Sequence, residues 1–264
     1  MPVPTCLTIA TSDSGGGAGI QADIKTITVL GGYAATAVTA VTVQNTLGVS
    51  GVHPVPLEVV KAQARAVLDD IGADAIKTGM LGAPELLEAV ALLIAEAGVP
   101  AVVDPVMIAK GGEALLPGGS VEVLRRCLVP AAALLTPNAP EAEALTGLVV
   151  DSLDGQRRAG EALIEAGAGA VLMKGGHVPG ERVTDVLITP GGETLFEGPR
   201  FETRHTHGTG CTLASGCATG LAQGMQLVDA VARAWAYTAE AIRRAPGLGA
   251  GHGPLDHGWP LRPR

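Results

Sequence analysis

The sequence predicts an α/β protein built on a largely parallel sheet, and three observations support this fold class. Short apolar stretches rich in β-branched residues alternate with longer stretches of helical spacing. Polar candidates for a site follow directly after the apolar stretches, which places them at one edge of such a sheet. The 264 residues include 37 glycines and are 47% hydrophobic, which favours close packing of helices on strands. We expect residues 1–264 to form a single domain, because no linker or repeat interrupts the pattern.

The N-terminal stretch is predicted to run from a strand through a glycine loop into a helix. Residues 5–10 are apolar and β-rich, residues 11–19 are polar and glycine-rich, and residues 20–30 have helical spacing. This order suggests a dinucleotide-binding fingerprint, but Ile20 stands where a glycine is required. A Walker A loop is excluded because no glycine precedes a lysine. We expect the loop to wrap around a small substrate.

The remaining elements continue the alternation. Small apolar residues alternate with threonines over residues 33–45, which predicts a strand. Further strands are predicted at residues 73–77, 101–103, 131–135 and 170–173, and a hairpin at 183–188 and 193–201. Helices are predicted at residues 57–71, 84–97, 120–127, 156–166, 212–223 and 227–244, with another beginning near Asn138. Residues 109–113 are expected to form a flexible loop.

Charge and cysteine content argue against several classes of protein. The formal net charge of −8 disfavours a nucleic-acid partner. The four cysteines show neither a CxxC pair nor metal-ligand spacing, which favours reduced thiols. The first ten residues carry no basic segment, and the uncharged residues 26–57 contain too many polar side chains to cross a membrane. A cytoplasmic location without a membrane segment is the expectation.

A glycine turn at residues 205–216 leads directly into a predicted helix. Gly208 and Gly210 allow backbone N–H groups to approach a ligand, and a helix start attracts anions. Cys211 falls in the first helical turn, where we expect the pKa of its thiol to be lowered. The same pattern is compatible with an ordinary helix start that holds an inert buried cysteine.

Three further candidates suit phosphate and magnesium chemistry. Lys174 follows a strand in a glycine turn and is a candidate phosphate contact. Asn138 and Glu141, together with Asp104, offer oxygen atoms that suit Mg²⁺ through its waters. On the residues alone, Asn138 and Glu141 are better explained as an ordinary helix N-cap with an acid in the first turn, and Asp104 also suits a turn before proline. Such a set fits phosphoryl transfer, with Cys211 accepting the proton of an acceptor hydroxyl.

Two candidates suit a flat heterocycle. Gln44 ends a predicted strand with an amide that can read a donor and acceptor pattern, although a polar strand end facing water has the same appearance. Met80 can pack on a ring, although a core methionine is the commoner interpretation of such a residue.

Taken together, the motifs resemble the bacterial hydroxymethylpyrimidine/phosphomethylpyrimidine kinases of thiamine biosynthesis, within the ribokinase-like superfamily. They cover residues 10–23, 39–45, 77–81, 104–107, 136–141, 174–177, 208–211 and 251–255. The resemblance implies a ribokinase-like three-layer α/β/α sandwich with a mostly parallel central sheet and a small reduced lid. It also implies that ATP and Mg²⁺ are used to phosphorylate 4-amino-5-hydroxymethyl-2-methylpyrimidine and then its monophosphate. Related enzymes are commonly dimers, so a homodimer is implied.

The resemblance also implies roles for matching residues. The catalytic set would be Cys211, Gly208, Gly210 and Lys174. The pyrimidine would be bound by Gln44, Asp23, Met80, Gly17, Ala18 and Val43, the nucleotide by Thr209, Asn138 and His205, and magnesium by Asp104, Asn138 and Glu141. Residues 111–113 depart from the Ser-Gly-Asp type of loop that relatives often carry.

Two alternatives compete with this interpretation. A pyridoxal kinase shares the fold, but Gln44 and the complete loop at residues 12–23 favour the pyrimidine. A non-catalytic pyrimidine sensor is disfavoured by the intact turn at residues 208–211 together with Lys174 and Asn138.

Overall fold

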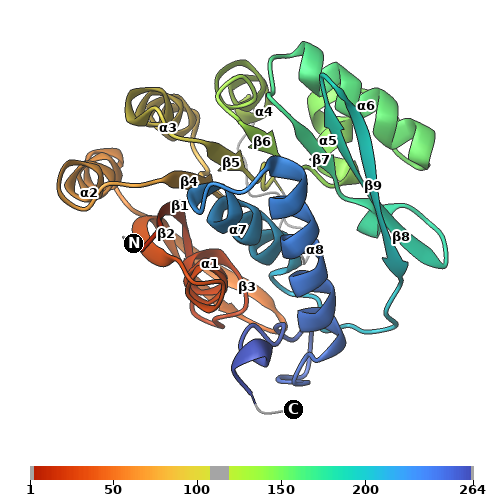
Figure 1. The fold of residues 1–264 in the computed structure, drawn as a ribbon. Helices are drawn as coiled ribbons and strands as arrows, with labels where there is room; N and C mark the ends of the chain where they lie inside the picture. The colour runs from red at the N-terminus through yellow and green to blue at the C-terminus, as the bar shows by residue number, and fades with distance from the viewer. Residues whose placement is uncertain (1–2, 108–118, 263–264) are drawn as a thin grey trace.

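The computed structural model describes residues 3–107 and 119–262. The helices and strands form three layers, with one nine-stranded sheet between two sets of helices (Figure 1). The predicted fold class, an α/β sandwich with a mostly parallel sheet, is confirmed. The predicted loop at residues 109–113 lies outside the described residues. Among the described residues, no helix combines the length and apolar character needed to cross a membrane.

The sheet has the strand order β3-β2-β1-β4-β5-β6-β7-β8-β9. Its strands are β1 (Thr5–Asp13), β2 (Tyr33–Asn45), β3 (Gly48–Pro54), β4 (Ala75–Thr78), β5 (Ala101–Val103), β6 (Leu134–Leu135), β7 (Val171–Met173), β8 (Arg182–Thr189) and β9 (Gly192–Pro199). The inner pairs from β2 to β7 are parallel, and the outer pairs β2–β3, β7–β8 and β8–β9 are antiparallel. Parallel strands need crossover helices, which cover both faces of the sheet and bury its centre.

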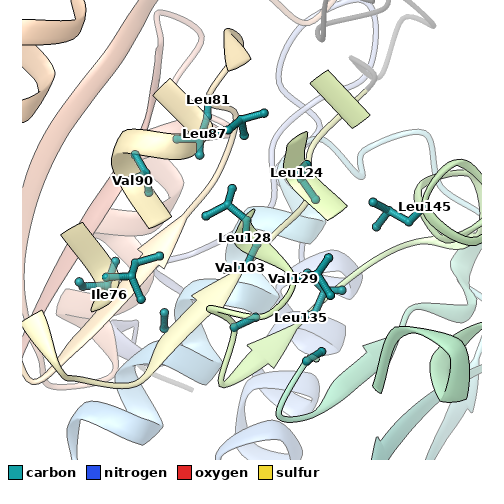
Figure 2. Packing of buried hydrophobic residues seen from close by; sticks show 14 of the residues in the cluster. Ile76, Leu81, Leu87, Val90, Val103, Leu124, Leu128, Val129, Leu135 and Leu145 are labelled. Carbon is teal, nitrogen blue, oxygen red and sulfur yellow. The ribbon is translucent and has the colours of Figure 1, made fainter. Parts of the chain in front are cut away.

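The helices lie on both faces of this sheet. They are α1 (Gly19–Val29), α2 (Leu57–Asp70), α3 (Pro84–Ala97), α4 (Ser120–Val123), η1 (Leu124–Leu128), α5 (Ala139–Thr146), α6 (Leu153–Glu165), η2 (Gly175–His177), α7 (Thr209–Ala222), α8 (Leu227–Arg243) and η3 (Trp259–Leu261). One core cluster joins α2, α3, η1, α5 and α6 to the strands, and a second joins α7 and α8 to the opposite face. Figure 2 shows Leu87 and Val90 of α3 sharing the first cluster with Leu128 of η1.

The elements differ from the sequence-based expectations at several places, and three of these differences have a clear physical meaning. The edge strand β3 was not predicted, because Gly48–Pro54 is mostly exposed and has no buried apolar face. Strand β6 is only two residues long, whereas residues 131–135 were expected. Helix α7 begins at Thr209, three residues before the expected start, so the glycine turn itself contributes the first helical turn.

The carboxyl ends of the parallel strands meet at one edge of the sheet. Asp13 ends β1, Asp104 follows β5, and Lys174 follows β7. In an open parallel sheet this edge is where ligands bind. The topology therefore brings together polar side chains that lie far apart in the sequence.

Candidate active site

A cavity of about 720 Å³ opens at this edge of the sheet. Most of the predicted site residues line it: Ala18, Gln44, Met80, Asp104, Asn138, Glu141, Lys174, Gly208, Thr209, Gly210 and Cys211. Four others do not: Gly17, Asp23, Val43 and His205. The cavity is large enough for two small ligands side by side, since its volume lies in the upper range of small-molecule sites.

The glycine turn packs against the N-terminal glycine loop. Gly208 has a φ of +88°, and a Cβ placed on it would lie 1.8 Å from the carbonyl oxygen of Gly17. Only glycine fits this contact. No side chain caps the start of α7; the Thr209 N–H donates to the Thr206 carbonyl, which leaves the N–H groups of Gly210 and Cys211 for an anion in the cavity.

Cys211 occupies the first turn of α7, as expected, but the expected fall in its pKa is wrong. Burial raises the pKa of the thiol to about 11, and the positive charge of Lys77 offsets only part of this effect. The loss of hydration destabilises the thiolate by more than the helix start and the charge of Lys77 stabilise it. Without bound ligands, the side chain is therefore a thiol at neutral pH.

Lys174 joins the two acidic side chains of the predicted magnesium site. Its Nζ lies 2.9 Å from Asp104 Oδ1 and 3.6 Å from Glu141 Oε2. Burial opposes the charge on Lys174, but the attraction of Asp104 and Glu141 outweighs it and raises the pKa of the ammonium group. Burial raises the pKa of Glu141 to about 7, against the opposing effect of Lys174. These three groups form a buried charged cluster on the cavity wall.

Asn138 and Glu141 also form the helix cap that the sequence left as an alternative. Asn138 Oδ1 accepts from the Glu141 N–H, and Glu141 Oε2 accepts from the Asn138 N–H. The amide oxygen of Asn138 is thus already engaged. Among the described residues, no group of three or more His, Cys, Asp or Glu side chains is arranged to hold a metal ion. Asp104 and Glu141 remain two carboxylates facing a cavity, which suits a Mg²⁺ ion that keeps several waters and also binds phosphates.

Asp23 differs from its expected place in the substrate pocket. Its carboxylate is fully buried beneath the cavity, where it pairs with Lys77 and accepts from the hydroxyls of Thr8 and Ser215. Lys77, to which the sequence analysis gave no role, lines the cavity. Burial opposes its charge, but Asp23 outweighs burial and raises the pKa of the ammonium group. A lysine at the end of an apolar strand is the sequence feature that could have identified Lys77 as a site residue.

His207, rather than His205, lies in the cavity wall. Its Nε2 is 2.9 Å from Asp13 Oδ2 and 3.3 Å from the side-chain amide of Gln44. His205 instead packs against Gly253 of the C-terminal segment. Both histidines precede the glycine turn closely, so the sequence alone does not indicate which of them lines the cavity.

Aromatic and apolar side chains line the opposite end of the cavity and were not predicted. Phe201, Leu213, Trp235 and Ile242 all contribute to this wall. They come from the segment after β9 and from helices α7 and α8, and the sequence analysis gave none of these four side chains a role. The cavity thus has an apolar end, a charged middle and an amide-lined end.

Unpaired helix N–H groups, a buried ammonium and two carboxylates around one cavity are the arrangement of a phosphoryl-transferring enzyme, here on a ribokinase-like fold. The chain belongs to the phosphomethylpyrimidine kinase family, whose model matches residues 13–256.

Comparisons with individual proteins agree with this family. The chain is 50% identical over 258 residues to a hydroxymethylpyrimidine/phosphomethylpyrimidine kinase from Streptomyces coelicolor, covering 98% of this chain and 96% of the relative. Among solved structures, it matches a Bacillus subtilis pyridoxal kinase in complex with ADP with a TM-score of 0.92 and 34% identity, over 99% of this chain and 100% of the other. It matches a phosphomethylpyrimidine kinase from Clostridium difficile with a TM-score of 0.81 and 39% identity, over 91% and 100%.

Proposed function

We propose that this chain uses ATP and Mg²⁺ to phosphorylate 4-amino-5-hydroxymethyl-2-methylpyrimidine, and then its monophosphate to the diphosphate, in thiamine biosynthesis. The observation that carries the proposal is that one cavity holds the amide of Gln44, the thiol of Cys211 and the start of α7. The amide offers a donor and an acceptor to an aminopyrimidine edge. The names of the related kinases support the same substrate.

The middle of the cavity is proposed to carry the reaction. The N–H groups of the glycine turn and the ammonium of Lys174 stabilise negative charge on the transferred phosphoryl group. Cys211, in the first turn of the same helix, accepts the proton of the substrate hydroxyl when it is in its thiolate form, which is the minor form at neutral pH. When bound, Mg²⁺ neutralises phosphate charge, and Asp104 and Glu141 would hold it, with Asn138 reaching it only through water.

The nucleotide is proposed to occupy the remaining part of the cavity. Thr209, in the first turn of α7, lies beside the phosphate position, and the wall that contains Phe201 and Trp235 suits the flat face of a base. His205 does not line the cavity, so any contribution from it is indirect.

Steady-state kinetics on two alcohols tests the proposal. The purified chain is given ATP and Mg²⁺ with either the aminopyrimidine or pyridoxal, and chromatography separates mono- from diphosphate. We expect faster turnover of the pyrimidine and formation of both products. Faster turnover of pyridoxal would refute the substrate assignment, and no release of ADP with either alcohol would favour a non-catalytic sensor. Lys174→Met should lower kcat at least about 100-fold, whereas the exposed-surface control Lys61→Met should not.

A homodimer is proposed on a separate observation. Val41 and Val43 are 48% and 62% exposed on one face of the outer β2–β3 hairpin, and β3 forms the edge of the sheet. Apolar side chains gathered on an edge hairpin suit a contact between two copies. Sedimentation velocity should show a dimer, and Val43→Lys should shift it to monomer.

We further propose that residues 1–264 act as one kinase domain in the cytoplasm, consistent with four free cysteines.

A further inference from the structure

We propose that Asp13 and His207 hold the side-chain amide of Gln44 in one orientation, with Oε1 toward His207 and Nε2 toward Thr42. His207 and Asp13 are then positioning residues that decide which way round the substrate ring binds. The inference rests on the proposed function for its substrate, but the orientation of the amide can be measured without any activity.

Asp13 acts only as a hydrogen-bond acceptor. Its Oδ1 accepts from the Gly15 N–H at 2.8 Å, and its Oδ2 accepts from the N–H groups of Gly17 and Ala18 at 3.0 and 2.8 Å. Burial opposes ionisation, but these bonds together with His207 hold the pKa of the carboxyl below its usual range. Asp13 is therefore a carboxylate with no proton to donate.

An ionised Asp13 fixes the hydrogen on His207. The 2.9 Å contact between His207 Nε2 and Asp13 Oδ2 requires Nε2 to carry the proton. The same Nε2 lies 3.3 Å from one of the two terminal atoms of the Gln44 amide. A protonated ring nitrogen cannot accept a hydrogen bond, so the amide atom that faces it must be oxygen.

The other end of the amide leads to the same orientation independently. The Thr42 hydroxyl lies 3.0 Å from the backbone oxygen of Ser12, to which it donates, and 3.1 Å from the second terminal atom of the Gln44 amide. A hydroxyl has one proton, so Thr42 Oγ1 accepts from Gln44, and the facing atom must be nitrogen. The structure has these two atoms the other way round, with the oxygen toward Thr42 and the nitrogen toward His207. The two atoms have the same shape, and their hydrogen bonds assign them.

This orientation determines the direction of the bound ring. The amide oxygen on the His207 side accepts from the 4-amino group, and the amide nitrogen on the Thr42 side donates to ring N3. The 5-hydroxymethyl group is attached beside C4, on the side away from N3. It therefore points toward His207, where the chain continues into the turn from Gly208 to Cys211. The opposite amide orientation would turn the ring over and carry the hydroxymethyl group away from that turn.

Proton NMR of the full chain, labelled with ¹⁵N at glutamine, measures the orientation directly. We expect the Gln44 Nε2 protons to give stronger nuclear Overhauser effects to the Thr42 methyl group than to the carbon-bound protons of His207. The reverse pattern would overturn the proposal. If the chain phosphorylates no alcohol, the proposed function is contradicted. The nuclear Overhauser effects still decide the orientation of the Gln44 amide, because they need no activity.

Kinetics with a 4-oxo analogue, which swaps the donor and acceptor of the aminopyrimidine edge, gives a second test. In the wild type the analogue should bind reversed, as a competitive inhibitor that is not phosphorylated. His207→Met removes the donor, so kcat/KM for the aminopyrimidine should fall roughly tenfold and phosphorylation of the analogue should appear. His207→Gln, whose amide nitrogen can replace Nε2, should restore the discrimination. The exposed His53→Met is the matched control. Unchanged discrimination in His207→Met, or equal losses in the Met and Gln variants, would overturn the proposal.

Discussion

Lys77 and Asp23 form an ion pair that is completely closed off from solvent, with Lys77 Nζ 2.9 Å from both carboxylate oxygens. The hydroxyls of Thr8 and Ser215 also donate to the carboxylate. The pair ties α1 and β4 together, and the charge of Lys77 lowers the pKa of the Cys211 thiol against the larger effect of burial. This buried pair contributes both to stability and to the electrostatics of the cavity.

Breaking this pair should destabilise the fold strongly. Asp23→Asn leaves the Lys77 ammonium buried without its counter-charge, which costs about 3–5 kcal/mol of unfolding free energy. Adding Lys77→Met removes the stranded charge and should recover much of the loss. Urea unfolding measures both proteins, with the exposed Asp69→Asn as control. A cost below about 1 kcal/mol for Asp23→Asn would show that the pair is not the stabilising element.

Cys211 should be needed mainly for the first phosphorylation. The first acceptor is an alcohol whose proton must leave, whereas the second is a phosphate that is largely ionised near neutral pH. Cys211→Ala should therefore slow the first step about 100-fold or more and the second far less, as single-turnover assays with each acceptor would show. Equal losses in both steps would mean that the thiol does something other than accept a proton.

The raised pKa of Cys211 adds a dependence on pH. Because the thiolate fraction grows with pH up to the pKa of about 11, the rate of the first phosphorylation should rise through the alkaline range. The rise should disappear in Cys211→Ala and be absent from the second phosphorylation. Rates measured between pH 7 and pH 9, with ATP and Mg²⁺ saturating, test this; the same rise in Cys211→Ala would assign it to another group.

The sequence predicted the sheet and the edge where the site lies, because polar residues that follow apolar strands mark the carboxyl ends of those strands. It did not predict the partners that the fold supplies over long distances. Asp23 pairs with a lysine 54 residues away, and His207 meets an aspartate 194 residues away. The predicted direction of the Cys211 pKa shift was wrong for the same reason. The sequence indicates the local helix start, but it does not show the burial that the rest of the fold imposes on the thiol.

Gly208→Ala should abolish both phosphorylations. The added Cβ would overlap the carbonyl oxygen of Gly17 at 1.8 Å, so the turn must move away from the N-terminal loop and its N–H groups lose their positions. Gly224, just beyond the other end of α7, is the matched control because its φ is +74° with nothing within 4 Å of the added carbon. Gly224→Ala should cost about 1–2 kcal/mol of stability and leave kcat unchanged. Comparable activity of the two variants would show that the turn does not hold the phosphate.

His257 should make the protein less stable in acid. It is buried, and the Thr212 hydroxyl donates to the Gly208 carbonyl, so Thr212 accepts from a neutral imidazole through Nε2. Burial, followed by the charges of Lys25 and His207, lowers the pKa of His257 from 6.5 to about 4. Between these values the unfolded chain binds the proton and the folded chain does not. The unfolding free energy should therefore fall as pH falls, by at most about 1.4 kcal/mol per pH unit.

His257→Gln isolates this contribution, because it keeps an N–H donor for Thr212 and removes the titration. Burial raises the pKa of Asp185 to about 6 and that of Glu141 to about 7, and both groups change stability in the opposite direction over the same range. They are present in both proteins, so the difference between the two urea-unfolding curves at each pH reports His257 alone. The stability of the variant relative to wild type should rise steadily from pH 6.5 to pH 4. A constant difference across this range would show that His257 is protonated in the folded protein as readily as in the unfolded chain.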